Sequence, residues 1–303
     1  MSESTPPTQN QKWRFWSGVC FAIVLLVVFA RPLLMLTSYV AGSQLHSYIL
    51  LVPFVSAHLL YIRRNQLPKN YTTDLPLTIV SLAAGLGLLA STYLAPAKND
   101  RIVLLTLSFL CCLAAGGFFF FGRDWMRAAA FPLAYLIFMV PMPDAMADAL
   151  EIASKSAAAE VANFLFHLSG TPFLRAGPIF QLPNITIEVA QECSGIRSSW
   201  VLFMTSILAA NLFLKTPWRR FALIAFVIPL GILRNGFRIL VIGLLCVNFG
   251  PQMIHSLIHR RGGPLFFALS LVPFLLMLWW LHRGEVRTRQ PNRAEVHQKG
   301  SNH

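Results

Sequence analysis

The chain has 303 residues, of which 55% are hydrophobic, and its 25 Lys and Arg against 12 Asp and Glu give a formal charge of +13. Only 12% of the residues are charged, against about a quarter in an ordinary soluble domain, and the mean hydropathy is +0.58. These values predict an integral membrane protein and exclude a soluble globular, disordered or collagen-like chain.

Long apolar runs predict the membrane spans, since about 20 apolar residues of helix cross the hydrocarbon layer. Eight runs qualify: 15–37, 45–62, 76–95, 102–121, 126–141, 196–214, 220–249 and 265–282. The first lacks a clear small-residue cleavage site, so it is interpreted as an uncleaved helix. The predicted fold class is therefore an all-α integral membrane protein with about eight transmembrane helices. A membrane domain over 15–282 is expected between cytoplasmic tails at 1–14 and 283–303.

The distribution of basic residues predicts the orientation of these helices, because Lys and Arg accumulate on the cytoplasmic side. With eight spans, one set of alternate segments holds fifteen Lys and Arg and the opposite set holds six. This difference predicts that both termini lie in the cytoplasm. In a membrane protein with few charges, the basic excess indicates topology and attraction to lipid headgroups, and no nucleic-acid partner is expected.

The longest outside segment is expected at 142–195, and it has two parts. Residues 144–167 are alanine-rich and favour a helix that lies at the outer surface or dips into it. Residues 179–190 alternate apolar and polar side chains around Pro183 and the following Asn, which predicts a small β-hairpin. The hairpin would bring Cys193 to the start of the sixth span.

Cys193 is the one cysteine of five outside an apolar run, in the segment QECSGIRSSW at 191–200. An odd number of cysteines without a CxxC pair makes a disulfide framework or zinc site improbable. A helix that begins near Gly195 and the guanidinium of Arg197 would both favour the Cys193 thiolate, whereas Glu192 opposes it. Two interpretations stay open here: a reactive thiol, or a cysteine that packs at the membrane border.

The seventh span carries the segment RNGFR, with Arg234, Asn235 and Arg238 inside an otherwise apolar run. An arginine at bilayer depth costs at least about 2.5–3.5 kcal/mol on insertion scales, so it is expected to face the bundle interior or a water-filled cavity. The two arginines are one helical turn apart and share a face. The alternative is a re-entrant break that leaves both near a surface.

The next outside connection holds His255 and His259 within GPQMIHSLIHRRGGP. An imidazole can serve as general base toward a thiol. The two histidines have i, i+4 spacing, but no carboxylate accompanies them to complete a zinc site, so no metal is expected. No glycine-rich nucleotide loop is present and no cofactor is implied. The spans thus bring a thiol, two arginines and one or two imidazoles to the outer side.

Several of these segments together resemble those of a known family. ECSGIRS, then RNGFRI, then GPQM followed by His259 and a glycine pair, together with SYILLVPF, FMVPMPD and ITIEVA, are similar to the exosortase and archaeosortase membrane transpeptidases. The similarity covers most of residues 45–280. The resemblance implies a prokaryotic cytoplasmic-membrane enzyme, associated with exopolysaccharide and with PEP-CTERM-type sorting signals. Its partners would be membrane lipid and secreted proteins whose C-terminal tail combines a short motif, a transmembrane helix and a basic cluster.

The resemblance also implies roles for individual residues. Cys193 would be the nucleophile that forms an acyl-thioester on the outer face, and His259 would be the histidine of the site. The NxxR pattern of bacterial members gives Arg238 as the catalytic arginine, which we favour, whereas archaeal relatives suggest Arg234. Supporting positions would be Glu192, Ser194, Gly195, Arg197 and Asn235. The stretch RRGGP departs from the family pattern, in which an aromatic residue follows the glycine, and the substrate preference is the property that this departure concerns.

Two other classes of function compete with this hypothesis. A transporter or export-machinery subunit could bind an anion through Arg234 and Arg238, although inverted repeats and paired broken helices are not evident. In a structural scaffold, both arginines would carry the free-energy cost of lying inside the membrane without serving a function. The sequence leaves open the exact sorting motif, the acyl acceptor, hydrolysis versus transfer, and the oligomeric state.

Overall fold

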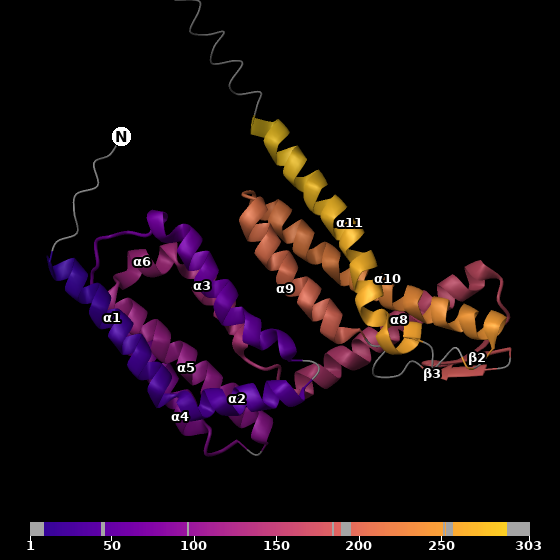
Figure 1. The fold of residues 1–303 in the computed structure, drawn as a ribbon, viewed down its shortest axis with the longest axis horizontal. Coiled ribbons are helices and arrows are strands. Elements are labelled where there is room, and N and C mark those ends of the chain that lie inside the picture. Colours follow the sequence, from indigo (N-terminus) through magenta and orange to yellow (C-terminus); the bar gives the residue numbers. More distant parts are fainter. Residues whose placement is uncertain are drawn as a thin grey trace, which may run out of the picture. The chain divides into compact units, whose positions relative to one another are not determined.

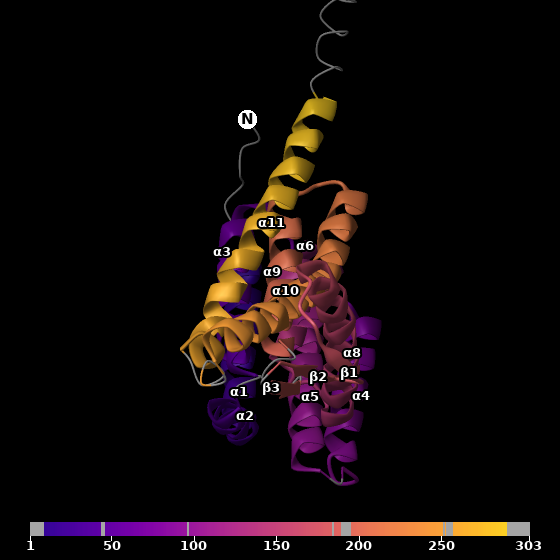
Figure 2. The same ribbon diagram turned by 90° about the vertical axis from the view of Figure 1, so that its right-hand side faces the viewer.

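The structure is a computed structural model, and it consists mainly of helices (Figures 1 and 2). It describes residues 9–43, 46–95, 97–183, 185–188, 195–250, 252 and 257–289, without the side chains of 98, 257–262 and 287–289. The chain divides into two compact units, Met1–Ala147 and Asp148–His303. The expected single membrane domain over 15–282 stays a prediction.

Unit 1 consists of helices joined by short turns. In chain order they are α1 (Gln9–Val28), α2 (Ala30–Gly42), η1 (Ser47–Leu51), α3 (Val52–Arg63), η2 (Arg64–Gln66), α4 (Leu75–Ser91), α5 (Lys98–Phe120), α6 (Gly122–Ala128), α7 (Ala130–Tyr135) and η3 (Leu136–Met139), where η marks a 3-10 helix. The antiparallel pair α4 and α5 packs closely. A Cβ added at Gly85 of α4 would lie 2.9 Å from the Cys112 Sγ of α5, and the Ser108 hydroxyl donates to the Gly85 carbonyl over 2.7 Å.

Prolines break two of the predicted spans. The span predicted at 15–37 is divided at Phe29, between α1 and α2, three residues before Pro32. The span predicted at 126–141 is divided at Ala129 and continues only as α7 and η3, with Pro132 at the same distance from the break. A proline has no N–H for the fourth preceding carbonyl and its ring clashes with that carbonyl, which explains both breaks. As single straight helices, both predictions were wrong.

Five helices are long and apolar enough to cross a membrane in the part of the chain that is described: Gln9–Val28, Asn99–Phe120, Ile196–Phe213, Pro217–Phe249 and Gly263–Val286. The pair Ala130–Met139 and Asp144–Ser169, bent by 88°, would raise the number to six if it is one broken span. This confirms a mainly helical, multi-pass membrane protein. The count of eight and the direction of the helices stay predictions.

Unit 2 contains the predicted insertion and three long helices. Its elements are α8 (Asp144–Ser169, which starts in unit 1), β1 (Leu174–Ala176), β2 (Ile179–Leu182), β3 (Ile185–Glu188), α9 (Ile196–Phe213), α10 (Pro217–Phe249) and α11 (Leu257–Arg289). The helix predicted at 144–167 is confirmed, and the hairpin predicted at 179–190 is confirmed over 179–188, with positions 184, 189 and 190 outside the described residues. The hairpin is β2 and β3, paired antiparallel from Ile179↔Glu188 to Leu182↔Ile185, and β1 adds a third strand on β2.

The long helix α10 contributes to two separate cores. Its first half packs against α9 and α11 through Leu202, Ala209, Ala210, Leu214, Leu223, Val227, Leu230, Phe274 and Leu281. Its second half packs against α8 and the hairpin through Ala158, Ala159, Ala162, Phe166, Phe180, Leu182, Ile187, Ile239 and Leu240. Figures 1 and 2 show the strands beside the ends of α8 and α10. The RNGFR segment lies where one core gives way to the other.

An ion pair joins the sheet to α8. The guanidinium of Arg175 in β1 donates to both carboxylate oxygens of Glu160, over 2.7 and 3.0 Å, and holds the pKa of Glu160 below its ordinary value. Because the carboxylate is the form that pairs, the bond is intact above the ordinary glutamate pKa of about 4.3 and is lost as the pH falls through the lowered, folded-state pKa. Exposed pairs of this kind add little stability.

At the other end of unit 2, a buried carboxylate fixes the turn between α9 and α10. Glu285 of α11 is 7% exposed and accepts hydrogen bonds from the backbone N–H groups of Lys215 and Thr216 and from the Thr216 hydroxyl, over 2.7–3.2 Å. Thr216 is the N-cap of α10, whose first N–H groups have no partner within the helix. Glu285 therefore satisfies donors at this helix start and lies at the positive end of its dipole.

The variant Glu285→Ala is expected to destabilise the protein by about 2–4 kcal/mol, because three donors at a part-buried site lose their acceptor. Thermal unfolding in detergent measures the effect, with an expected decrease in Tm of about 5–10 °C. Thr216→Val is the matched control, since it removes one of these bonds and should cost about 1 kcal/mol. A Glu285→Ala variant no less stable than Thr216→Val would contradict this role.

Candidate active site

The turn that precedes α9 requires glycine at position 195. Gly195 is the N-cap of the helix and has φ +62°, in the left-handed region that side chains rarely adopt. A Cβ added there would lie 2.1 Å from the Asn235 Oδ1 and 2.4 Å from its Nδ2. Because both its conformation and its close contact with Asn235 exclude a side chain, Gly195 lies directly against α10 at the start of α9.

Arg234 ties α10 to the same turn. Its Nη2 donates to the Gly195 carbonyl over 3.2 Å and to the Ser199 hydroxyl over 2.9 Å. Its Nε and Nη2 also donate to the Asn235 Oδ1, over 3.3 and 3.2 Å. The Gly195 carbonyl accepts further bonds from the backbone N–H of Ser199 and the hydroxyl of Ser198, over 2.9 and 3.1 Å. The Gly195 carbonyl therefore accepts hydrogen bonds from α10 and from the first turn of α9, and these bonds fix the start of α9.

The guanidinium of Arg234 is a buried cation with neutral partners. The residue is 6% exposed, and neither of the two ion pairs found in the described part of the chain includes it. Its Nη1 is buried and has no hydrogen-bond partner among the described residues. Arg238 follows one turn later on the same face and is half-buried. Two like charges at one place favour an anion near them.

The helix that carries both arginines is continuous and longer than a bilayer requires. α10 has 33 residues, or about 50 Å of helix, against about 30 Å of hydrocarbon. The alternative of a re-entrant break at RNGFR is therefore wrong. Glycines let the neighbouring helices approach α10 closely: a Cβ at Gly231 would lie 2.9 Å from the Ser199 Oγ, and one at Gly236 would lie 2.4 Å from the Val161 Cγ1 of α8.

The structure brings together Arg234, Asn235 and Gly195 from the set of predicted site residues. Arg197 is exposed in the first turn of α9. Cys193, Glu192 and Ser194 lie outside the described residues, and so does the side chain of His259, whose backbone is in α11. Among the side chains that are described, no group of three or more His, Cys, Asp or Glu could hold a metal ion.

Sequence reasoning missed Ser199 and Gly231. Ser199 follows Gly195 by four residues, and Gly231 precedes Asn235 by four, so both share a helix face with a predicted site residue. That spacing was the available signal. The sequence gives no indication, however, that these two faces pack against each other.

Two further motifs meet inside unit 1. η1 lies in the SYILLVPF segment, η3 ends on the first two residues of the FMVPMPD segment, and these two short helices are in contact. Asn99 at the start of α5 donates to the Asp144 carboxylate over 2.5 Å and to the Met142 carbonyl over 3.5 Å. These contacts order the segment that leads into α8.

Comparison with known proteins supplies one finding. The family model described as transmembrane exosortase matches residues 37–279, which covers most of the chain, including the whole of α8, α9 and α10. No curated protein and no solved structure matched the chain.

Proposed function

Because the chain belongs to the transmembrane exosortase family, we propose that it is a protein-sorting transpeptidase or cysteine peptidase. It cleaves the C-terminal sorting tail of secreted proteins at the outer face of a prokaryotic cytoplasmic membrane, through an acyl-thioester on Cys193. The observation that carries the proposal is the bond between Arg234 and Gly195, because it ties the arginine helix to the turn two residues after that cysteine.

The surroundings of this turn favour a thiolate. A helix N-terminus carries a partial positive charge, and α9 begins directly after Gly195. The buried guanidinium of Arg234 adds a full positive charge that no described carboxylate offsets. Both effects lower the cost of ionising a thiol held nearby.

The length of α10 supports a site at the outer membrane border. If the helix enters the membrane at its start, beside Arg219 and Arg220, then Arg234 lies about 26 Å and Arg238 about 32 Å along it. Because Pro229 lies inside α10 and the helix changes direction in its second half (Figure 2), the depth is less than these lengths, and both arginines lie in the far half of about 30 Å of hydrocarbon, toward the water and the substrate backbone. The remainder of α10 packs on α8 and the hairpin, which suits an extracytoplasmic insertion.

The proposed roles follow from these contacts. Arg234 already donates to the cysteine turn and acts as a positioning residue, whereas Arg238, one turn further out, stabilises the oxyanion that forms at the attacked carbonyl. His259 accepts the Cys193 thiol proton and returns it to the leaving amine. The acyl group then passes from sulfur to an amine, a hydroxyl or a lipid nucleophile in transfer, or to water in hydrolysis.

Co-expression with secreted proteins that carry a candidate sorting tail tests the proposal. Mass spectrometry of the product is expected to show a new C-terminus near the tail motif, and a mass increment on that terminus would distinguish transfer from hydrolysis. A substrate that keeps its tail intact in the presence of the full chain would count against the assignment.

The alternative of an anion-binding transporter subunit rests on the same buried cation, since Arg234 and Arg238 would also hold a small anion. The two functions differ in their need for sulfur. Alkylation of Cys193 from outside should stop an acyl transferase, whereas an anion site on α10 should tolerate it.

Arg234→Lys is expected to slow tail cleavage about 10–100-fold, because a lysine cannot donate to the Gly195 carbonyl, Ser199 and Asn235 at once, and hydrogen bonds to charged groups contribute about 1.5–3 kcal/mol each. In the same variant, the pH at which Cys193 becomes reactive toward an alkylating agent should rise. Ser199→Ala, which removes one acceptor, is the milder control. An unchanged alkylation profile in Arg234→Lys would leave Arg234 without a positioning role.

A further inference from the structure

We propose that a groove among α1, α3, α5, α6 and α7 in unit 1 binds one acyl chain of an anionic phospholipid, whose phosphate lies against basic residues at the α6 end. This inference does not depend on the enzymatic proposal. It rests on the shape of the groove, on its apolar lining and on the charges at one end.

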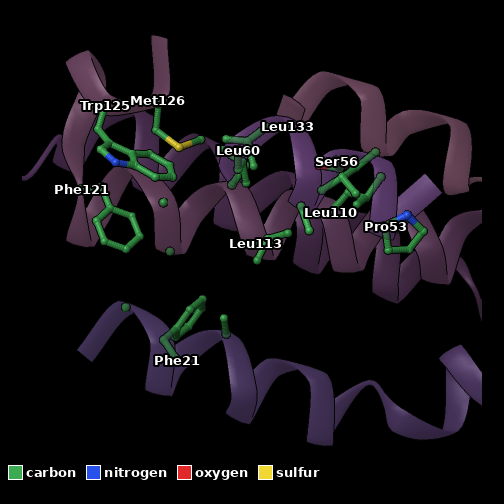
Figure 3. Close-up of a pocket in the computed structure, with 17 residues that line it drawn as sticks. Phe21, Pro53, Ser56, Leu60, Leu110, Leu113, Phe121, Trp125, Met126 and Leu133 are labelled. Carbon is green, nitrogen blue, oxygen red and sulfur yellow. The ribbon is translucent and has the colours of Figure 1, made fainter. Parts of the chain in front are cut away.

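The groove is a pocket of about 340 Å³ that is open on one side. Figure 3 shows Phe21 of α1 facing the opposite wall, with Phe121, Trp125 and Met126 at one end and Pro53 at the other. Its lining is almost entirely apolar. The hydroxyl of Ser56 donates to the Pro132 carbonyl over 2.7 Å, so its hydrogen is already used. The interior therefore suits a hydrocarbon chain and gives no partner for a polar headgroup.

The size of the groove excludes a helix as its occupant. Its lining on α5 and the following turn runs from Leu110 to Phe121, about 16 Å along the helix axis, which is close to half the thickness of the hydrocarbon layer. A helix about 10 Å in diameter and of that length fills roughly 1,200 Å³, more than the whole empty space of the groove, about 970 Å³. A single acyl chain from one leaflet has the right length and cross-section.

Basic residues gather at the aromatic end of the groove. Arg123 and Arg127 are exposed on α6, where Arg123 precedes the lining residue Met126 by three positions on the same side of the helix and Arg127 follows it directly. Arg64 follows the lining residue Leu60 by one helical turn, where α3 ends.

Arg14 precedes Gly18 by one turn, and its Nε and Nη2 donate to the Phe120 and Phe119 carbonyls over 3.1 and 3.0 Å. These bonds fix a fourth guanidinium at the end of α5, next to Phe121.

The balance of charge at this end selects an anionic headgroup. The nearby acids are Asp124, on α6, and Asp74, whose carboxylate already accepts the Leu77 N–H as the N-cap of α4. Four guanidinium groups against these two carboxylates leave a positive rim, and a basic residue near a membrane surface attracts an anionic lipid by about 1 kcal/mol, or about fivefold. A zwitterionic lipid would gain little from the same rim.

Tryptophan fluorescence gives a direct test, because Trp125 lines the groove. The full chain, with its other six tryptophans replaced by phenylalanine, is reconstituted in phosphatidylcholine bilayers containing either dibrominated phosphatidylglycerol or dibrominated phosphatidylcholine. Bromine on the acyl chain quenches an indole that it touches. The control variant keeps only Trp280, which is 63% exposed on α11.

The expected result is that the anionic brominated lipid quenches Trp125 at about a fivefold lower mole fraction than the zwitterionic one, whereas Trp280 responds equally to both. Arg123→Gln with Arg127→Gln should remove the preference and leave quenching by phosphatidylcholine. Ala114→Phe, which fills the groove, should weaken quenching by both lipids. Equal quenching of Trp125 by the two lipids, or a Trp125 that neither lipid quenches, would overturn the proposal.

If the chain does not fold without its other six tryptophans, a second measurement on the wild-type protein tests the same proposal. The wild-type protein, purified from bilayers of equal phosphatidylglycerol and phosphatidylcholine, should retain more phosphatidylglycerol than Arg123→Gln/Arg127→Gln purified in the same way. Equal retention by the two proteins would contradict an anionic site at this rim.

Discussion

Cys193→Ala is expected to abolish cleavage of a tail-bearing secreted protein, by at least about a thousandfold, while the protein stays folded in the membrane. The physical reason is that no other group in the proposed mechanism can form the acyl-enzyme, and removal of the nucleophile leaves only the catalysis that binding and oxyanion stabilisation provide. The measurement is the rate at which the new C-terminus forms, by mass spectrometry, at matched amounts of enzyme in the membrane.

Cys193→Ser should be nearly as damaging, because a hydroxyl ionises far less readily than a thiol and the positive surroundings of the turn do not close that gap. Cys20→Ala is the matched control, since Cys20 is a free, exposed cysteine on α1, and its loss should leave the rate unchanged. Retained cleavage in Cys193→Ala would remove the enzymatic assignment altogether.

Gly195→Ala is expected to reduce cleavage about a hundredfold or more. The added Cβ meets the Asn235 amide at 2.1 Å, so either the start of α9 or the RNGFR segment must move by an ångström or so. A displacement of that size at reacting groups costs about a hundredfold in rate. The left-handed φ of +62° adds about 1–2 kcal/mol of backbone strain to the folded state.

A second glycine separates these two effects. Gly177 has φ +61°, and nothing lies within 4 Å of a Cβ added there. Gly177→Ala should therefore lose similar stability in thermal unfolding and keep its cleavage rate. If the two alanine variants lowered the rate equally, the contact between Gly195 and Asn235 would have no part in the reaction.

Local sequence patterns predicted the elements that depend on neighbours in the chain. The helix at 144–167 followed from helix-forming residues, and the hairpin at 179–190 followed from alternating side chains around a turn. Apolar run length was a weaker guide. It joined α1 to α2 and α6 to η3 across Pro32 and Pro132, because a hydropathy count does not register a missing backbone donor.

For the candidate site too, the sequence predicted one part and only the tertiary structure gave the other. The sequence by itself determined the class of the protein, a multi-pass exosortase-family membrane protein, and it singled out the arginines of RNGFR, because a charge inside an apolar run is costly without a function. Only the tertiary structure showed that Arg234 contacts Gly195 at the start of α9. Arg234 and Gly195 are 39 positions apart, and their bond depends on how closely α9 and α10 approach each other at Gly231. That approach is a matter of packing between two surfaces, and neither helix encodes it in its own periodicity.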